Sequence, residues 1–171
     1  EYYHTHLAGQ LIQRAIAIEK LDQSTRLICL FDDDIVLESG ALDKMISFWN
    51  DTQSETAGVA FNVINNPEHK CSWIQRLLFF SVPENGRVLR SGMSTPLSPT
   101  SKDIKTQWLC GGATVWKLDI LKNFPQNQIK AKWAIGEDLI YSYPIGKQFP
   151  LYVCAEAKVT VEVNNIDNLP R

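Results

Sequence analysis

Three consecutive aspartates, Asp32, Asp33 and Asp34, directly follow the short apolar run RLICLF. Successive strand residues alternate between the two faces of a sheet, so Asp32 and Asp34 are expected to project to one side and Asp33 to the other. Ligands of open α/β sheets bind just outside the carboxyl ends of strands. Two carboxylates there suit Mg²⁺ or Mn²⁺, and a cation would also relieve their mutual repulsion. The alternative is an Asp-rich strand exit that caps the next turn.

A second acidic pair, Glu137 and Asp138, follows Gly136 at a predicted helix start. The helix dipole favours acids in a first turn, which is a sufficient structural reason for the pair. The functional interpretation is a general base. A carboxylate near the apolar residues Trp133 and Ile135 would have its pKa raised toward useful basicity.

Paired glycines, Gly111 and Gly112, interrupt the strand-like segment WLCGGATVW. Glycines inside an apolar strand mark a bulge or the close approach of a ligand or another part of the backbone. Simple packing explains them equally well.

Helical and strand patterns alternate along the chain, which predicts an α/β fold. The length of 171 residues fits one domain spanning 1–171. The continuous apolar run RLICLF predicts a strand buried on both faces, in a sheet that helices cover. Residues 39–50 predict a helix with Leu42, Met45, Ile46 and Trp49 facing inward. The segment CSWIQRLLFF favours a core helix over one that docks on a membrane surface.

Composition excludes several classes of protein. The net charge of −2, with no basic stripe, argues against a nucleic-acid partner. No apolar run approaches the roughly 18 residues of a membrane span. The cysteines form no CxxC pair, and Cys29, Cys110 and Cys154 have apolar neighbours, so we expect reduced core thiols in a cytoplasmic protein.

With these elements in order, the chain resembles the inverting family 2 glycosyltransferases of the GT-A fold. The resemblance runs through AGQLIQRAIAIEK, RLICLFDDDIVLESGALDKMISFW, NGRVLRSGM, WLCGGATVWKLDIL and IGEDLIYSYPIGKQFPLYVCAEAKV. It implies a GT-A-like mixed, mostly parallel sheet flanked by helices. It also implies a chain incomplete at the N-terminal side, because only 31 residues precede Asp32.

On the donor side, the resemblance implies that Asp34 ligates Mn²⁺ or Mg²⁺ on the diphosphate of a nucleotide sugar. Asp32 would help to hold the metal or the ribose, and Asp33 would be a nucleotide contact. Gly111 and Gly112 would let the backbone approach the donor sugar.

On the acceptor side, Asp138 resembles the family's catalytic base, with Glu137 beside it shaping the acceptor site. Trp108 or Trp133 could offer a stacking face. The acceptor would be a saccharide or a lipid-linked molecule, which allows a peripheral membrane location. Many relatives carry a metal-binding His after the last strand, where this chain has Val161.

Three further expectations follow from the same residues. An open sheet edge left by the absent βα units would be covered by a second copy of the chain, making a homo-oligomer. A haloacid-dehalogenase-like phosphatase is the enzyme alternative, with Asp32 as the nucleophile and Asp34 as the acid/base. A non-catalytic scaffold or binding domain that keeps the GT-A-like fold is the alternative outside enzymes.

Overall fold

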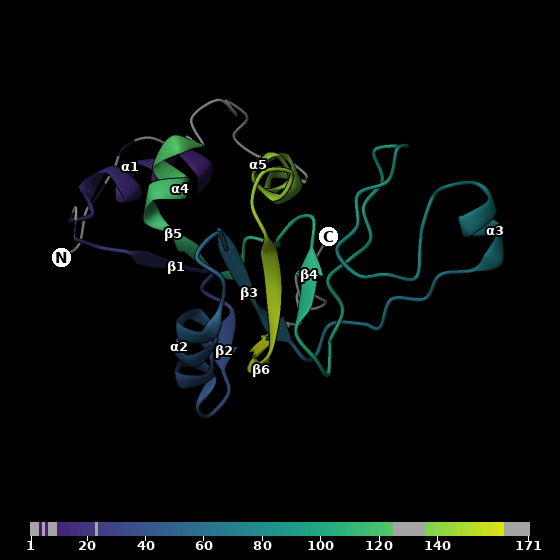
Figure 1. Ribbon diagram of the computed structural model, residues 1–171, viewed down its shortest axis with the longest axis horizontal. Helices are drawn as coiled ribbons and strands as arrows, with labels where there is room; N and C mark the ends of the chain where they lie inside the picture. The colour runs from purple at the N-terminus through teal and green to yellow at the C-terminus, as the bar shows by residue number, and fades with distance from the viewer. Residues whose placement is uncertain (1–3, 5, 7–9, 23, 125–135, 163–171) are drawn as a thin grey trace, which may run out of the picture.

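The computed structural model describes residues 4, 6, 10–22, 24–124 and 136–162 (Figure 1). The helices and strands follow one another along the chain as α1 (Gln10–Lys20), β1 (Leu27–Phe31), β2 (Ile35–Leu37), α2 (Ala41–Asp51), β3 (Gly58–Val63), α3 (Trp73–Leu77), β4 (Ile104–Thr106), β5 (Ala113–Lys117), α4 (Leu118–Asn123), α5 (Glu137–Gly146) and β6 (Leu151–Val161).

The strands form one mixed sheet in the order β1-β5-β3-β6-β2, and β4 pairs with β6 outside this path. Of the strand pairs, β3–β6 is parallel, and β1–β5, β3–β5, β2–β6 and β4–β6 are antiparallel. The α/β class with a mixed sheet is therefore confirmed, whereas the expectation that most strand pairs are parallel is wrong. Short apolar runs look alike in both kinds of pairing, so strand direction is not visible in their composition.

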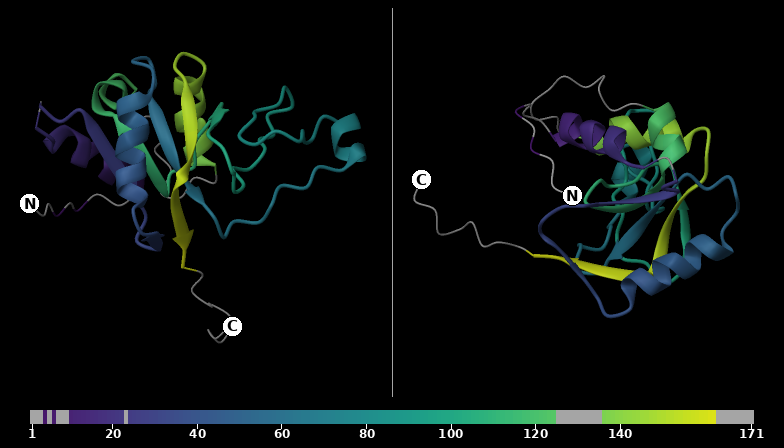
Figure 2. Two further views of the ribbon diagram at one scale, coloured as in Figure 1. Left: turned by 60° about the horizontal axis from the view of Figure 1, so that its bottom comes forward. Right: turned by 90° about the vertical axis from the view of Figure 1, so that its left-hand side faces the viewer.

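Helices cover both faces of this sheet (Figure 2). The core on one face packs side chains of α1, α4 and α5 against the strands, including Ile18, Leu121 and Ile145. The core on the other face is built around Met45 of α2 together with residues of β3, β5 and β6. Leu42, which was expected to face inward with Met45, is 45% exposed. Ile46 is also exposed, so the inward face of α2 is narrower than its apolar pattern indicated.

β1 lies at an edge of the sheet, and its residues alternate between exposed and half-buried. The prediction that this strand is buried on both faces is wrong. Ile28 and Leu30 pack against the core, whereas Leu27 and Cys29 are exposed. Among the described residues, β1 has one neighbouring strand, β5. Its continuous apolar sequence therefore did not indicate burial on both faces. Of the three thiols expected in the core, Cys154 is buried, but Cys29 and Cys110 are exposed.

α3 also departs from expectation. None of its residues is buried, and it lies apart from the sheet and the other helices (Figure 1). The segment expected to form a core helix is thus an exposed one.

A bulge in β6 shapes the centre of the sheet. Phe61 pairs with Cys154, but the next residue, Asn62, pairs with Lys158. The buried Asn62 amide fills this irregularity: its Nδ2 donates to the Ala155 carbonyl at 2.9 Å and to the Thr100 carbonyl at 2.8 Å. Its Oδ1 accepts from the Thr100 N–H at 3.1 Å. Asn62 therefore fastens the segment around residue 100 to the sheet.

Replacing Asn62 with Ala should destabilise the protein by about 2–3 kcal/mol, because buried backbone groups lose their partners. Urea unfolding followed by circular dichroism measures the change. Asn66→Ala is the matched control, since Asn66 is exposed and its side chain donates only one long hydrogen bond, of 3.4 Å, to the Leu97 carbonyl. Equal losses in the two variants would contradict this account of the bulge.

Candidate functional site

Asp32 and Asp34 of the first acidic motif and Asp138 of the second line one cleft, whereas Asp33 and Glu137 are not among its lining residues. This cleft has a volume of about 320 Å³, and Asp32, Asp34, Gly112 and Asp138 all line it. Its apolar wall comes chiefly from β3, β6 and the segment that returns to the sheet; the other lining residues are Ile35, Ala60, Phe61, Asn62, Val63, Asn66, Pro96, Leu97, Ser98, Trp108, Cys110, Ala113, Val153 and Val161.

The aspartate triplet lies in a tight turn between β1 and β2. The Asp32 N–H donates to the Gly112 carbonyl at 2.8 Å, and the Ile35 N–H closes the turn onto the Asp32 carbonyl at 3.3 Å. Strand alternation therefore does not explain why Asp32 and Asp34 face one cleft; the turn does. Asp33 occupies the same turn but is not among the residues that line the cleft.

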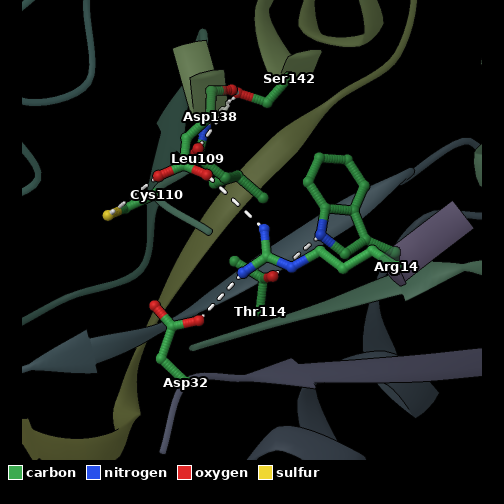
Figure 3. Close-up of polar contacts among 8 residues, drawn as sticks. Arg14, Asp32, Leu109, Cys110, Thr114, Asp138 and Ser142 are labelled. Atoms are coloured by element: carbon green, nitrogen blue, oxygen red, sulfur yellow. Dashed lines mark hydrogen bonds and ion pairs between the residues drawn. The ribbon is translucent and has the colours of Figure 1, made fainter. Parts of the chain in front are cut away.

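Arg14 of α1 lies between the two acidic motifs (Figure 3). Its Nη2 donates to Asp32 Oδ1 at 3.0 Å, and its Nη1 lies 3.8 Å from Asp138 Oδ1. The Arg14 side chain is only 14% exposed, but the side chains of Asp32 and Asp138 are 37% and 30% exposed, so water screens these ion pairs in part. In the sequence, Arg14 is one polar residue of the segment AGQLIQRAIAIEK, and nothing there signals this pairing.

The two glycines make room for the carboxylates. A Cβ on Gly111 would overlap Asp138 Oδ1 and lie 2.9 Å from Arg14 Nη1. A Cβ on Gly112 would lie 2.9 Å from Asp32 Oδ2. The glycine pair, expected to admit a donor sugar, thus first of all admits Asp32 and Asp138.

Ser142 holds Asp138 in register with this glycine segment. Its buried hydroxyl accepts from the Leu109 N–H at 2.9 Å and lies 2.6 Å from the Asp138 carbonyl and 3.1 Å from the Leu109 carbonyl (Figure 3). It can donate to one carbonyl at a time. Sequence reasoning missed Ser142, although its place one helical turn after Asp138 is a weak signal.

Glu137 has a raised pKa. Burial of the carboxyl is the main cause, the negative charge of Asp138 adds to it, and the charge of Arg14 opposes it. Trp133 and Ile135, expected to provide the apolar surroundings, lie outside the described residues. Cys110, beside the acids, also has a raised pKa. The residue is exposed, but the protein around its sulfur disfavours the charged thiolate, and the negative charge of Asp138 adds to this effect, so the thiol stays protonated near neutral pH.

Trp108 lines the cleft, but its indole N–H is engaged elsewhere. It donates to the Thr95 carbonyl at 3.1 Å and so ties the returning loop to the segment before the glycines. The polar edge of Trp108 therefore holds structure together, and Trp133, the other expected stacking residue, is not described.

The donor set suits a divalent cation that also binds substrate oxygens. Within the described ranges, no three His, Cys, Asp or Glu side chains gather closely enough to hold a metal by themselves. Mg²⁺ commonly binds through one or two carboxylates and completes its shell with water and phosphate oxygens, and the cleft offers the carboxylates of Asp32 and Asp34 for such a role. Val161, the position at which the stated resemblance would place a metal-binding His, pairs with Ile35 and adds an apolar side chain to the cleft.

Comparisons with known proteins add little. No protein-family model matches the chain, and no curated protein matches it. A solved structure titled "Crystal Structure of A197 from STIV" is similar at 14% sequence identity, with a TM-score of 0.46, over 94% of this chain and 80% of that one. At this level the likeness carries no argument about function.

Replacing Arg14 with Gln should raise the pKa of Glu137 further, because loss of the positive charge disfavours the ionised carboxylate. A carbon-13 NMR titration of the Glu137 carboxyl measures the shift. Lys20→Gln removes a charge from the same helix and should leave that titration unchanged. A Glu137 pKa that stays constant or falls in the Arg14 variant would contradict the electrostatic account.

Proposed function

We propose that this chain is an inverting glycosyltransferase, which moves a sugar from a nucleotide-diphosphate donor to a hydroxyl acceptor with Mn²⁺ or Mg²⁺ as its cofactor. One observation carries the proposal. Asp32 and Asp34, the candidate metal ligands, line the same cleft as Asp138, the candidate base. The donor would be a nucleotide sugar, and the acceptor a saccharide or a lipid-linked molecule.

On the donor side, Asp34 and the Oδ2 side of Asp32 would hold the metal. Bound there, the cation would neutralise the charge that develops on the departing diphosphate. Asp33 does not line the cleft, so we leave it out of the donor site. Gly112 keeps the wall beside Asp32 open, because a side chain at this position would reach the carboxylate.

On the acceptor side, Asp138 would take the proton from the attacking hydroxyl. Ser142 holds the backbone of Asp138, and Arg14 holds its carboxylate on the cleft side of α5. Glu137, at the start of the same helix, would shape the acceptor pocket. The apolar wall provided by Phe61 and its neighbours would limit water near the reacting atoms, which favours transfer over hydrolysis.

The phosphatase alternative has weaker support. It needs Asp32 as a nucleophile, but Arg14 donates to Asp32 Oδ1 at 3.0 Å. A guanidinium so close stabilises the carboxylate and lowers its nucleophilicity. The scaffold alternative rests on Val161, which supplies no metal ligand, and the nucleotide titration below separates it from the transferase.

Calorimetric titration of UDP and GDP, with and without Mn²⁺, tests the proposal. We expect one nucleotide to bind only with the metal and Asp34→Ala to weaken that binding at least tenfold, about 1.4 kcal/mol. Asp33→Ala is the matched control, since it removes the same charge from the same turn.

Equal binding by the Asp34 variant and the parent would refute the assigned metal site. No metal-dependent binding of either nucleotide to the parent would favour a non-catalytic scaffold. Transfer of labelled sugar to an added acceptor is the direct measure of activity, and Asp138→Asn should abolish it while leaving nucleotide binding intact.

A further inference from the structure

Residues 67–94 form an arm that carries α3 away from the sheet (Figure 1). The later part of the arm returns to β4, where the Gln107 N–H donates to the Gly86 carbonyl and the Val88 N–H donates to Gln107 Oε1. The base of the arm is fastened by His69, whose Nε2 lies 2.8 Å from the Val82 carbonyl and 3.1 Å from Ser81 Oγ. α3 begins with a capping box, in which Ser72 and Gln75 each accept the other's backbone N–H. The arm is thus an ordered element with its own hydrogen bonds.

Several large apolar side chains of the arm are exposed to solvent. Trp73 is 73% exposed and Phe79 is 75% exposed. The other exposed apolar residues of the arm are Ile74, Leu77, Leu78, Phe80 and Met93. A contiguous group of this kind on a soluble surface marks an interaction site, because isolated exposure is ordinary but clustering is not.

Phe79 occupies a position that would suit glycine better. Its φ of 56° is the one positive value among the described non-glycine residues. The Phe79 N–H donates to the Arg76 carbonyl and the Phe80 N–H to the Gln75 carbonyl, which is the Schellman pattern that glycine usually completes. A bulky residue in this conformation is strained. The chain therefore bears a local cost while presenting an aromatic ring to the surroundings.

The charge of the arm differs from that of the whole chain. It carries four exposed cations, Lys70, Arg76, Arg87 and Arg90, and two acids, Glu68 and Glu84. The arm is therefore net positive by two, whereas the chain has a net charge of −2. A segment that carries both cations and exposed Trp, Leu and Phe side chains complements an anionic lipid surface, in which the rings reach the acyl boundary and the cations meet the headgroups.

We propose that this arm docks on an anionic membrane surface and inserts the side chains around Trp73, Leu77 and Phe79. Within α3, the exposed apolar residues Trp73, Ile74 and Leu77 lie on one side of the axis, and Gln75 and Arg76 lie on the other. A helix with two such sides can lie in the plane of a lipid surface with its apolar side inward. Within the described part of the chain, no helix is long and apolar enough to cross a membrane.

The residues that lead into and out of the arm border the candidate cleft. Asn66 precedes the arm and Pro96 and Leu97 follow it, and all three line the cleft. If the proposed glycosyl transfer holds, this placement favours an acceptor presented from the membrane, such as a lipid-linked hydroxyl. Docking itself does not depend on that function.

Vesicle flotation tests the proposal with the chain as it stands and without any nucleotide. We expect binding to phosphatidylglycerol vesicles, much weaker binding to phosphatidylcholine vesicles, and a decline as salt rises. The double variant Trp73→Ser with Leu77→Ser should lower the partition coefficient at least about tenfold, because two large side chains no longer insert.

Phe79→Gly guards against misfolding as an explanation, since it relieves the strained backbone and removes only an exposed ring. It should keep or raise the unfolding temperature while weakening vesicle binding. The control is Leu42→Ser with Ile46→Ser, which removes exposed apolar side chains from α2 and should leave flotation unchanged.

Absence of binding to either kind of vesicle would overturn the proposal, as would undiminished binding by the arm variants. A parent that sediments as a dimer, becomes monomeric in the Trp73 and Leu77 variant and ignores vesicles would assign the arm to a second copy of the chain. Metal-dependent nucleotide binding is measured separately, so these results on vesicle binding do not decide whether the proposed glycosyl transfer is correct.

Discussion

Two carboxylates that approach each other from opposite sides of a cleft repel, and here the guanidinium of Arg14 lies between them. It holds Asp32, at the end of β1, and Asp138, at the start of α5, in one place. The largely buried position of Arg14 strengthens this attraction, while the partly exposed carboxylates remain in contact with water that screens it in part. Gly111 and Gly112 permit the arrangement by leaving space where side chains would collide with the acids. The candidate chemistry depends on this balance of charge and space.

The second constraint is the irregular pairing of β6. If β6 were regular, the Ala155 carbonyl in its bulge would not face Asn62. The loop around Thr100 would then lose its connection through Asn62 to the bulge. The buried amide of Asn62 satisfies carbonyls from both the bulge and the loop, so it fixes the wall of the cleft to the sheet. Buried amides that bond fully in this way confer rigidity as well as stability. The cleft thus has a wall set by hydrogen bonds and a charged rim set by Arg14.

The arm follows a different physical logic from the core. Elsewhere apolar residues gather in two layers on either side of the sheet. On the arm they remain in water, one of them on a strained backbone, in a segment that has more cations than acids. Departures from such local rules are expected at functional sites, which include surfaces that bind a partner. The arm and the cleft share connecting chain, so a surface contact and a chemical site are mechanically adjacent.

The sequence by itself determined the α/β class, the glycine pair, the acids that meet at the cleft and the aromatic content of the arm, because these follow from local pattern. Tertiary structure decided what local pattern does not encode. It set the antiparallel strand directions, the edge position of β1 and the exposure of α3, because each depends on which neighbour a segment finds. It also placed Arg14 and Ser142 against Asp138, since residues far apart in the chain meet only when the sheet and its helices assemble.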